Sequence, residues 1–147
     1  MADRVVIVRE GVHLLSLPFT SIDEILGTER IVSLADLPED AAPEGADDPH
    51  WVHTRGEWLP LAMFLPDSVV TDRSQIVIVR WGQTGRAYIV DQVLGIESLG
   101  RMIQFPEAAI PFTDIPFAGV RLWKGRPVLE LDLSRLISLD LGGRQDG

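Results

Sequence analysis

Proline and glycine divide this chain into short apolar runs, and this spacing of turn residues restricts its fold more than any other feature of the sequence. Val5–Val8 is followed by the turn-like sequence Arg-Glu-Gly and by a second apolar run, which is the pattern of a β-hairpin. Apolar runs at 76–81 and 118–123 are followed by glycine-containing turns in the same way. Many short strands joined by close glycine turns are typical of an all-β barrel or sandwich.

The hairpin pattern occurs twice along the chain. Ile76 lies about 70 positions after Val5, and Gly125 lies a similar distance after Gly56, as expected for an internal repeat. Because all hairpins share turn chemistry, chance similarity is the alternative to a duplication. The simplest interpretation is a duplicated architecture.

We therefore predict a single domain over 1–147 that consists of a first β-barrel half at 1–72 and a second at 73–147. In each half the later hairpin runs into an apolar, helix-compatible stretch, at 61–65 and at 133–139, and the second of these predicts a helix near the C-terminus. Neither half is large enough for a core of its own, so the two should share an apolar interface. A groove at the exposed side of that interface is a place where a partner could bind.

Composition excludes several classes of protein. The chain has no cysteine, which removes disulfides, thiolate catalysis and cysteine-based metal sites. Its formal charge of −9 disfavours nucleic acid as a partner, and it also disfavours anionic membrane surfaces. The N-terminal sequence does not resemble a secretory signal, and the apolar runs are too short to span a bilayer, so we expect a cytoplasmic protein without direct membrane insertion.

The segment 36–49 differs from the rest of the chain. It contains six acidic residues, no basic residue and three prolines. Such a segment has almost nothing to bury, so we expect a solvated acidic loop between two strands.

Two aspartates are the best candidates for acid–base chemistry. Asp91 lies between two apolar runs, and Asp132 precedes the helix-compatible stretch near the C-terminus. A pair of carboxylates can act as acid and base when their environments separate their pKa values. The structural alternative, which we favour, is that Asp91 ends a strand and accepts hydrogen bonds from nearby backbone N–H groups, while Asp132 caps a helix.

Two histidines close to acidic residues are the only suggestion of a metal site. His50 and His53 follow Asp47 and Asp48. On a strand, however, residues three apart point to opposite faces, and no third histidine is near in sequence. We therefore expect no metal and no other cofactor.

Several segments of the second half resemble the CheW-like domain family, the coupling module of bacterial chemosensory systems. The sequence "IVIVRWGQTGRAYIVDQVLGIESL", followed by "AGVRLWKGRPVLELDLSRLI", is similar to that family's pattern. The matching positions are Val90-Asp91-Gln92-Val93, Gly119-Val120 and Leu131-Asp132-Leu133.

The first half resembles the same family less closely. "SIDEIL" supplies Glu24 and Ile25, and "TRGEWLPL" supplies Arg55, Gly56 and Pro60, so that the resemblance extends over about residues 5–138. The chain departs from the family at the long acidic loop. It also has "AMFL" where an aspartate is usual, and Arg86-Ala87 where a glycine is usual.

The resemblance implies two five-stranded, SH3-like β-barrels that share a hydrophobic interface, with short helices. It also implies an adaptor that couples chemoreceptor tips to the regulatory domain of a histidine kinase. The candidate receptor-binding groove contains six residues: Ile22, Glu24, Ile25, Arg55, Val93 and Leu94. From the sequence alone a core position is the favoured interpretation of the four apolar ones, while Glu24 and Arg55 could equally be a solvated ion pair or rim residues that set partner choice.

Four functions follow from these observations. A non-enzymatic adaptor of a chemosensory array is the first. Because the first half has diverged, an accessory coupling protein that binds receptors without recruiting the kinase is the alternative. A small-ligand-binding β-barrel, which needs a deep closed cavity, and a hydrolase using Asp91 or Asp132 are less favoured.

Overall fold

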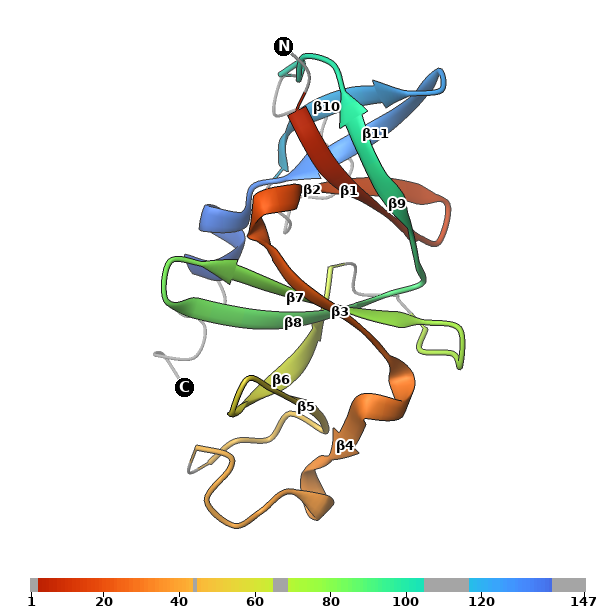
Figure 1. Cartoon of the computed structure of the whole chain (residues 1–147). Coiled ribbons are helices and arrows are strands. Elements are labelled where there is room, and N and C mark those ends of the chain that lie inside the picture. Colours follow the sequence, from red (N-terminus) through yellow and green to blue (C-terminus); the bar gives the residue numbers. More distant parts are fainter. Residues whose placement is uncertain (1–2, 44, 65–68, 105–116, 139–147) are drawn as a thin grey trace.

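The structure is a computed structural model that describes residues 3–43, 45–64, 69–104 and 117–138. Two curled sheets lie one above the other (Figure 1). We call the five-stranded sheet the second barrel; its strand order is β10-β11-β2-β1-β9. Its strands are β1 (Asp3–Glu10), β2 (His13–Pro18), β9 (Gln92–Leu99), β10 (Phe117–Trp123) and β11 (Arg126–Leu131).

We call the other sheet the first barrel; it has six strands in the order β3-β7-β8-β6-β5-β4. The all-β class and the barrel-like sheets expected from the sequence are confirmed, and the three-residue strand β4 is the one addition to the expected five. The strands are β3 (Ile22–Gly27), β4 (Ile31–Ser33), β5 (His50–Thr54), β6 (Glu57–Met63), β7 (Gln75–Trp81) and β8 (Thr84–Val90). Three 3₁₀ turns connect them: η1 (Phe19–Ser21), η2 (Thr28–Arg30) and η3 (Leu34–Asp36).

The two sheets have the same plan, and each contains strands from both halves of the sequence. The order β10-β11-β2-β1-β9 corresponds strand by strand to β5-β6-β8-β7-β3, and the parallel pair β11–β2 corresponds to the parallel pair β6–β8. The β1–β2 hairpin therefore completes the second barrel, whereas β7–β8 completes the first. The expected boundary between 72 and 73 separates the repeated sequences but not the barrels, because each repeat gives its first hairpin to the other sheet.

Matching turns support the duplication. The β5–β6 turn has positive φ at Arg55 (49°) and Gly56 (80°), and the β10–β11 turn has positive φ at Lys124 (52°) and Gly125 (75°). Two successive residues with positive φ form the hairpin turn whose twist suits the flanking strands. The same turn thus occurs at equivalent places in the two repeats.

Strands from both sheets share the largest apolar cluster, which we call the central core. Both hairpins that are exchanged between the sheets contribute to it, as do the C-terminal helix and Phe64, which stacks on Tyr88 with ring centroids 4.3 Å apart. The expected shared interface is therefore present. Among its members are Val6, Val8, Leu15, Leu17, Val77, Val79, Tyr88, Val90, Leu133 and Leu136.

Each barrel also has a smaller core of its own. The second-barrel core contains Val5, Ile7, Leu14, Leu99 and Val128, and the first-barrel core contains Val52, Leu59, Ile76, Ile78 and Ala87. Because alternate residues of a strand face opposite sides, β1 and β7 each supply both the central core and the core of their own barrel.

The helix expected near the C-terminus is present and occupies 133–138. The other helix-compatible stretch differs: 61–63 is the end of strand β6, because Leu61 pairs in parallel with Ala87 of the central strand β8. Pairing with a neighbouring strand thus overrides a local preference that fits a helix. None of the helices in the described part of the chain has the length and apolar character needed to cross a membrane.

The acidic loop forms successive turns below the first barrel (Figure 1). The N–H of Leu34 donates to the carbonyl of Pro49 at 3.0 Å, which closes the loop at its base. The Trp51 indole N–H donates to the Asp48 carbonyl at 2.7 Å, and this anchors the end of the loop to β5.

Candidate protein-binding surface

Strand β3 lies at an edge of the first barrel, and its backbone contains a bulge. Ile22 pairs with Val79 of β7, and Glu24 pairs with the next residue, Ile78, so Asp23 is an extra residue in β3. A bulge redirects side chains locally and increases the twist of its strand. Two successive carboxylates, Asp23 and Glu24, are placed at this irregularity.

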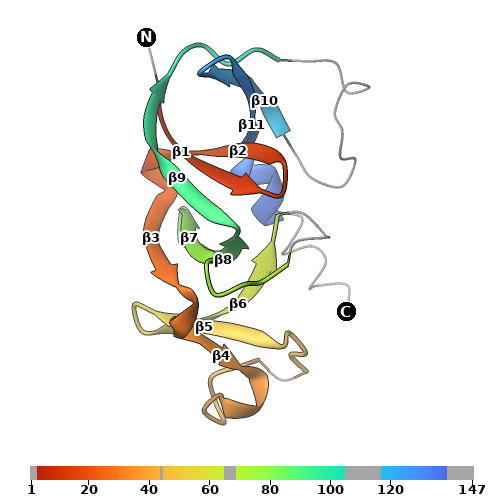
Figure 2. The same cartoon turned by 90° about the vertical axis from the view of Figure 1, so that its right-hand side faces the viewer.

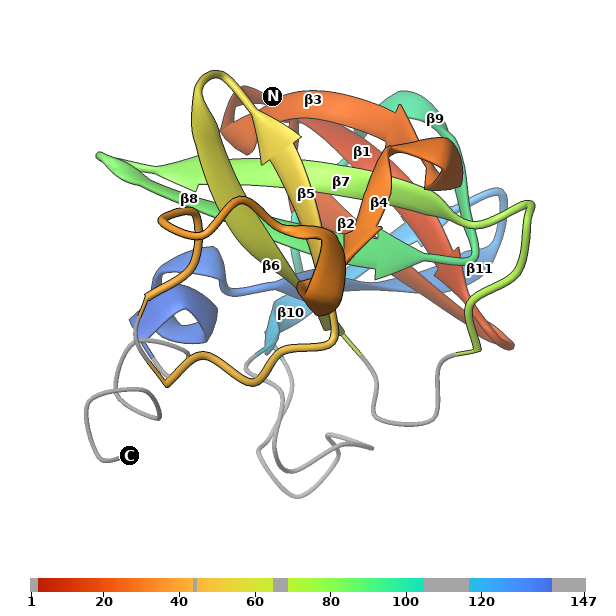
Figure 3. The ribbon, with the colours of Figure 1, turned by 90° about the horizontal axis from the view of Figure 1, so that it is seen from below.

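Strand β9 is the equivalent edge strand of the second barrel and has a bulge at the equivalent place. Val93 pairs with Val8 of β1, and Gly95 pairs with Ile7, so Leu94 is the extra residue. β3 and β9 lie on the same side of the molecule, as Figures 2 and 3 both show. The repeat thus provides a pair of matching strands around the interface between the barrels.

The apolar residues of these two strands occupy matching positions. Ile22 and Val93 are half-buried, and both pack against the central core. Ile25 and Ile96 follow them and are both exposed, by 40% and 49%. Ile25 pairs with Val77 of the central core, so it shares the face of β3 that is turned toward the second barrel. Apolar side chains exposed along two edge strands form a candidate surface for a partner.

The six residues expected to form the groove do not all come together. Ile22, Ile25 and Val93 belong to the surface just described, whereas Leu94 is half-buried against the second-barrel core. None of the four apolar residues is fully buried, although Ile22, Val93 and Leu94 pack against the apolar cores. Ile96 was not expected from the family pattern. The repeat could have identified it, because it lies the same distance beyond Val93 as Ile25 lies beyond Ile22.

The polar residues Glu24 and Arg55 belong to a network at the mouth of the first barrel. The Arg55 guanidinium Nε lies 2.8 Å from Asp23 Oδ2, whereas its distance from Glu24 Oε1 is longer, 3.8 Å. Glu24 instead accepts a hydrogen bond from the Thr54 hydroxyl. The expected pair of Glu24 and Arg55 is therefore loose, and Asp23, which the sequence did not single out, is the closer partner of Arg55.

Arg80 of β7, the strand that pairs with β3, also belongs to this network. Its Nε donates to Asp23 Oδ2 at 3.0 Å, and its Nη2 donates to Glu57 Oε1 at 2.7 Å. The hydrogen bond to Glu57, followed by the one to Asp23, raises the pKa of Arg80 above its usual value. Asp23 is thus held between two guanidinium groups.

Asp91 has a structural role with partners far away in the sequence. Its Oδ2 accepts a hydrogen bond from the backbone N–H of Gly11 at 2.7 Å, and Arg9 Nη1 lies 3.5 Å from the same oxygen. Its own N–H donates to the Arg9 carbonyl at 3.1 Å. The expectation of a backbone-bonded aspartate is confirmed, but the donor belongs to the β1–β2 turn and not to a neighbouring residue, because β9 pairs with β1.

Asp132 caps the C-terminal helix as expected. Its Oδ1 accepts hydrogen bonds from the Arg135 backbone N–H at 3.2 Å and from the Ser134 hydroxyl at 3.0 Å. Asp91 and Asp132 therefore each stabilise local structure, at a strand junction and at a helix N-terminus.

The histidines of β5 are both exposed. The His53 ring packs at 4.7 Å from the Trp58 ring on β6, with which it is paired in the sheet. Among the residues that the structure describes, no three histidine, cysteine or acidic side chains are grouped as metal ligands would be.

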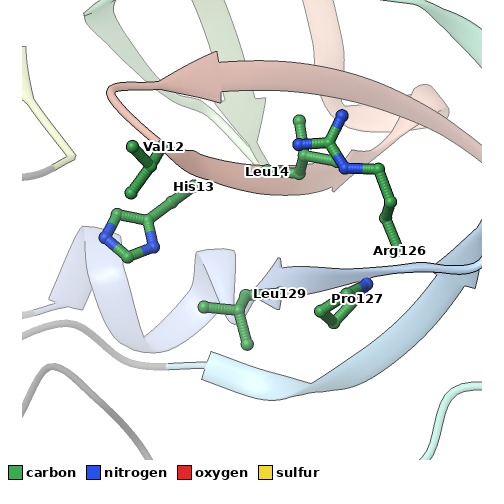
Figure 4. A pocket seen from close by; sticks show the side chains of 6 residues that line it. All are labelled: Val12, His13, Leu14, Arg126, Pro127 and Leu129. Carbon is green, nitrogen blue, oxygen red and sulfur yellow. The ribbon is translucent and has the colours of Figure 1, made fainter.

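A hollow of about 280 Å³ lies where β2 and β11 diverge in the second barrel (Figure 4). Its wall includes Val12, which is 86% exposed, and the exposed residues Arg126 and Pro127, so the hollow opens to solvent. It differs from the deep closed cavity that a small-ligand-binding barrel requires. The lining residues are Val12, His13, Leu14, Arg126, Pro127 and Leu129.

The fold and this surface define a class of protein: a pair of β-barrels that exchange hairpins, with an apolar surface at the junction between them. The family model of the CheW-like domain matches residues 4–140, and the chain belongs to this family. The match supports the expected class, an adaptor or scaffold of chemotaxis signalling.

Comparison with solved structures supports the fold. The crystal structure of the scaffolding protein TtCheW from Thermoanaerobacter tengcongensis matches with a TM-score of 0.70 and 17% sequence identity, over 90% of this chain and 90% of that chain. A comparison with curated proteins found no significant match.

Proposed function

We propose that this protein is a non-enzymatic adaptor of a bacterial chemosensory array, which binds the signalling tip of a chemoreceptor and couples it to a histidine kinase. The observation that carries the proposal is the matched pair of edge strands, β3 and β9, which expose Ile25 and Ile96 beside the central core. A chemoreceptor tip is a helical hairpin, and an apolar stripe on a helix fits an apolar groove. Family membership supports the same conclusion.

Receptor binding is tested by titration calorimetry with chemoreceptor signalling-tip fragments. We expect Ile25→Asp and Ile96→Asp each to weaken binding by about 30-fold, the effect of losing a hot-spot side chain. Val12→Asp is the matched control, because Val12 is also an exposed apolar residue but lies in the β1–β2 turn. Absence of binding by the unaltered protein at about 100 µM, or equal weakening by the control, would refute receptor binding through this surface.

Kinase recruitment is a separate part of the proposal. The resemblance to the family implies that the first barrel supplies the kinase contact. In this chain the first barrel carries the acidic loop beside β4 and β5. This observation favours a second candidate function, an accessory adaptor that binds receptors but does not recruit the kinase. Titration against the kinase regulatory domain separates the two, since tight binding would exclude the accessory role.

A further inference from the structure

Arg55 is an exposed cation beside β3, because it contacts the carboxylates of Asp23 and Glu24. Its side chain is 60% exposed. The residue itself lies in the β5–β6 turn, where its φ is 49°. Its shortest contacts with the carboxylates of Asp23 and Glu24 are made through Nε. Nη1 and Nη2 make no closer contact with either carboxylate, and the exposed side chain leaves them within reach of a partner.

Asp23 determines where this guanidinium lies. Its side chain is only 17% exposed, and its Oδ2 lies 2.8 Å from Arg55 Nε and 3.0 Å from Arg80 Nε. Arg80 is fixed from the other side by Glu57 at 2.7 Å. The chain of contacts from Glu57 through Arg80 and Asp23 ends at Arg55, the most exposed member.

Gly85 provides the space that Arg80 occupies. A Cβ atom at Gly85 would lie 2.9 Å from Arg80 Nη1, which is closer than real Cβ contacts allow, and 3.3 Å from its Cζ, which is unusually tight. Because the obstructing atoms are at the end of a flexible side chain, alanine at this position would displace the guanidinium and leave the backbone in place. The network can thus be disturbed without removing a charge.

We propose that Asp23 is a positioning residue, which directs Arg55 to bind a carboxylate on the partner helix next to the helix's apolar stripe. The inference rests on the proposed function and adds the chemistry of the partner. A guanidinium fork matches a carboxylate in a bidentate geometry, for which a pre-oriented side chain loses less entropy. The net charge of −9 repels acidic residues of a partner. A carboxylate of the partner can therefore bind where a cation such as Arg55 faces it.

A role in binding and a role in stability have different signatures here. The Asp23–Arg55 pair is largely solvated on the arginine side, and such pairs contribute little to folding stability. Removal of Asp23 also breaks its hydrogen bond to Arg80, whose side chain is 27% exposed, so a modest loss of stability is expected beside the weaker binding. A merely structural residue would lower stability without any coupling to Arg55 in binding.

The experiment is a double-mutant cycle on binding of a chemoreceptor tip fragment, measured between 50 and 500 mM salt. We expect Arg55→Ala to weaken binding about tenfold and to flatten its salt dependence, because an interfacial ion pair is lost. Asp23→Asn should weaken binding about fivefold, and the double variant should bind no more weakly than Arg55→Ala alone, since Asp23 acts through Arg55.

Gly85→Ala is the test that changes no charge. It should weaken binding in the same direction as Asp23→Asn, whereas Gly100→Ala, where a Cβ meets nothing within 4 Å, should bind like the unaltered protein. Additive effects of Asp23→Asn and Arg55→Ala, or unchanged binding by both, would overturn the positioning role while leaving receptor binding intact. If the unaltered protein does not bind the tip at all, the proposed function fails and this inference fails with it.

Discussion

A buried ion pair in the second barrel allows a quantitative test of how this fold is stabilised. The side chain of Arg121 on β10 is 6% exposed, and that of Glu130 on β11 is 9% exposed. Arg121 Nε donates to Glu130 Oε1 at 2.8 Å, and its Nη1 donates to the Gly100 carbonyl at 2.6 Å. The hydrogen bond to Glu130 is also the main reason that the pKa of Arg121 is raised.

The perturbation is Glu130→Gln, which keeps the size of the side chain but removes its charge. Breaking a buried pair by removing one partner costs about 3–5 kcal/mol, because the remaining charge is buried without compensation. Asp3 remains 3.0 Å from Arg121 and the Gly100 carbonyl remains bonded, so we expect the lower end, about 3 kcal/mol. In a chain of this length that corresponds to a fall in Tm of about 6–12 °C.

The free energy of unfolding is measured by urea denaturation with circular dichroism. Arg9→Gln is the control, because it breaks the Arg9–Asp91 pair, in which the arginine is 42% exposed, and should cost less than about 1 kcal/mol. The double variant Arg121→Met, Glu130→Leu should recover most of the loss, since apolar residues of similar volume can replace a buried pair. A Glu130→Gln variant as stable as the Arg9→Gln control would show that this reasoning is incorrect.

Two further changes test the packing of the second barrel and the C-terminal helix by the same measurement. Gly119→Ala places a Cβ 2.7 Å from the backbone carbonyl oxygen of Ile103, so it should cost about 1–3 kcal/mol, whereas Gly100→Ala should be close to neutral. Asp132→Ala removes the helix cap and should cost about 1 kcal/mol, and a stability equal to that of the unaltered protein would contradict the capping role.

Local patterns in the sequence predicted the hairpins and their turns well. Short apolar runs and glycine turns are local properties, and the structure places Gly56 and Gly125 in equivalent turns. The exchange of hairpins between barrels could not be predicted in this way. It depends on pairings such as that of Val6 with Ile96, which leave no local signal.

The candidate surface was predicted in part for the same reason. The apolar positions Ile22, Ile25 and Val93 could be identified because they recur in the family pattern and the repeat. The role of Asp23 could not be identified, because it depends on a bulge in β3 that brings its carboxylate to Arg80, a residue 57 positions away. Irregular pairing, and not residue type, makes it a partner of two arginines.

Exchange of the first hairpin also has a consequence for how the molecule is made. Ser16 of β2 contacts Glu130 of β11, 114 positions later, and Gly11 bonds to Asp91, 80 positions later. During synthesis the β1–β2 hairpin can therefore complete its sheet only after β9 and β11 have left the ribosome. Assembly dominated by such distant pairings is slow, and the incomplete second barrel is the intermediate most exposed to aggregation.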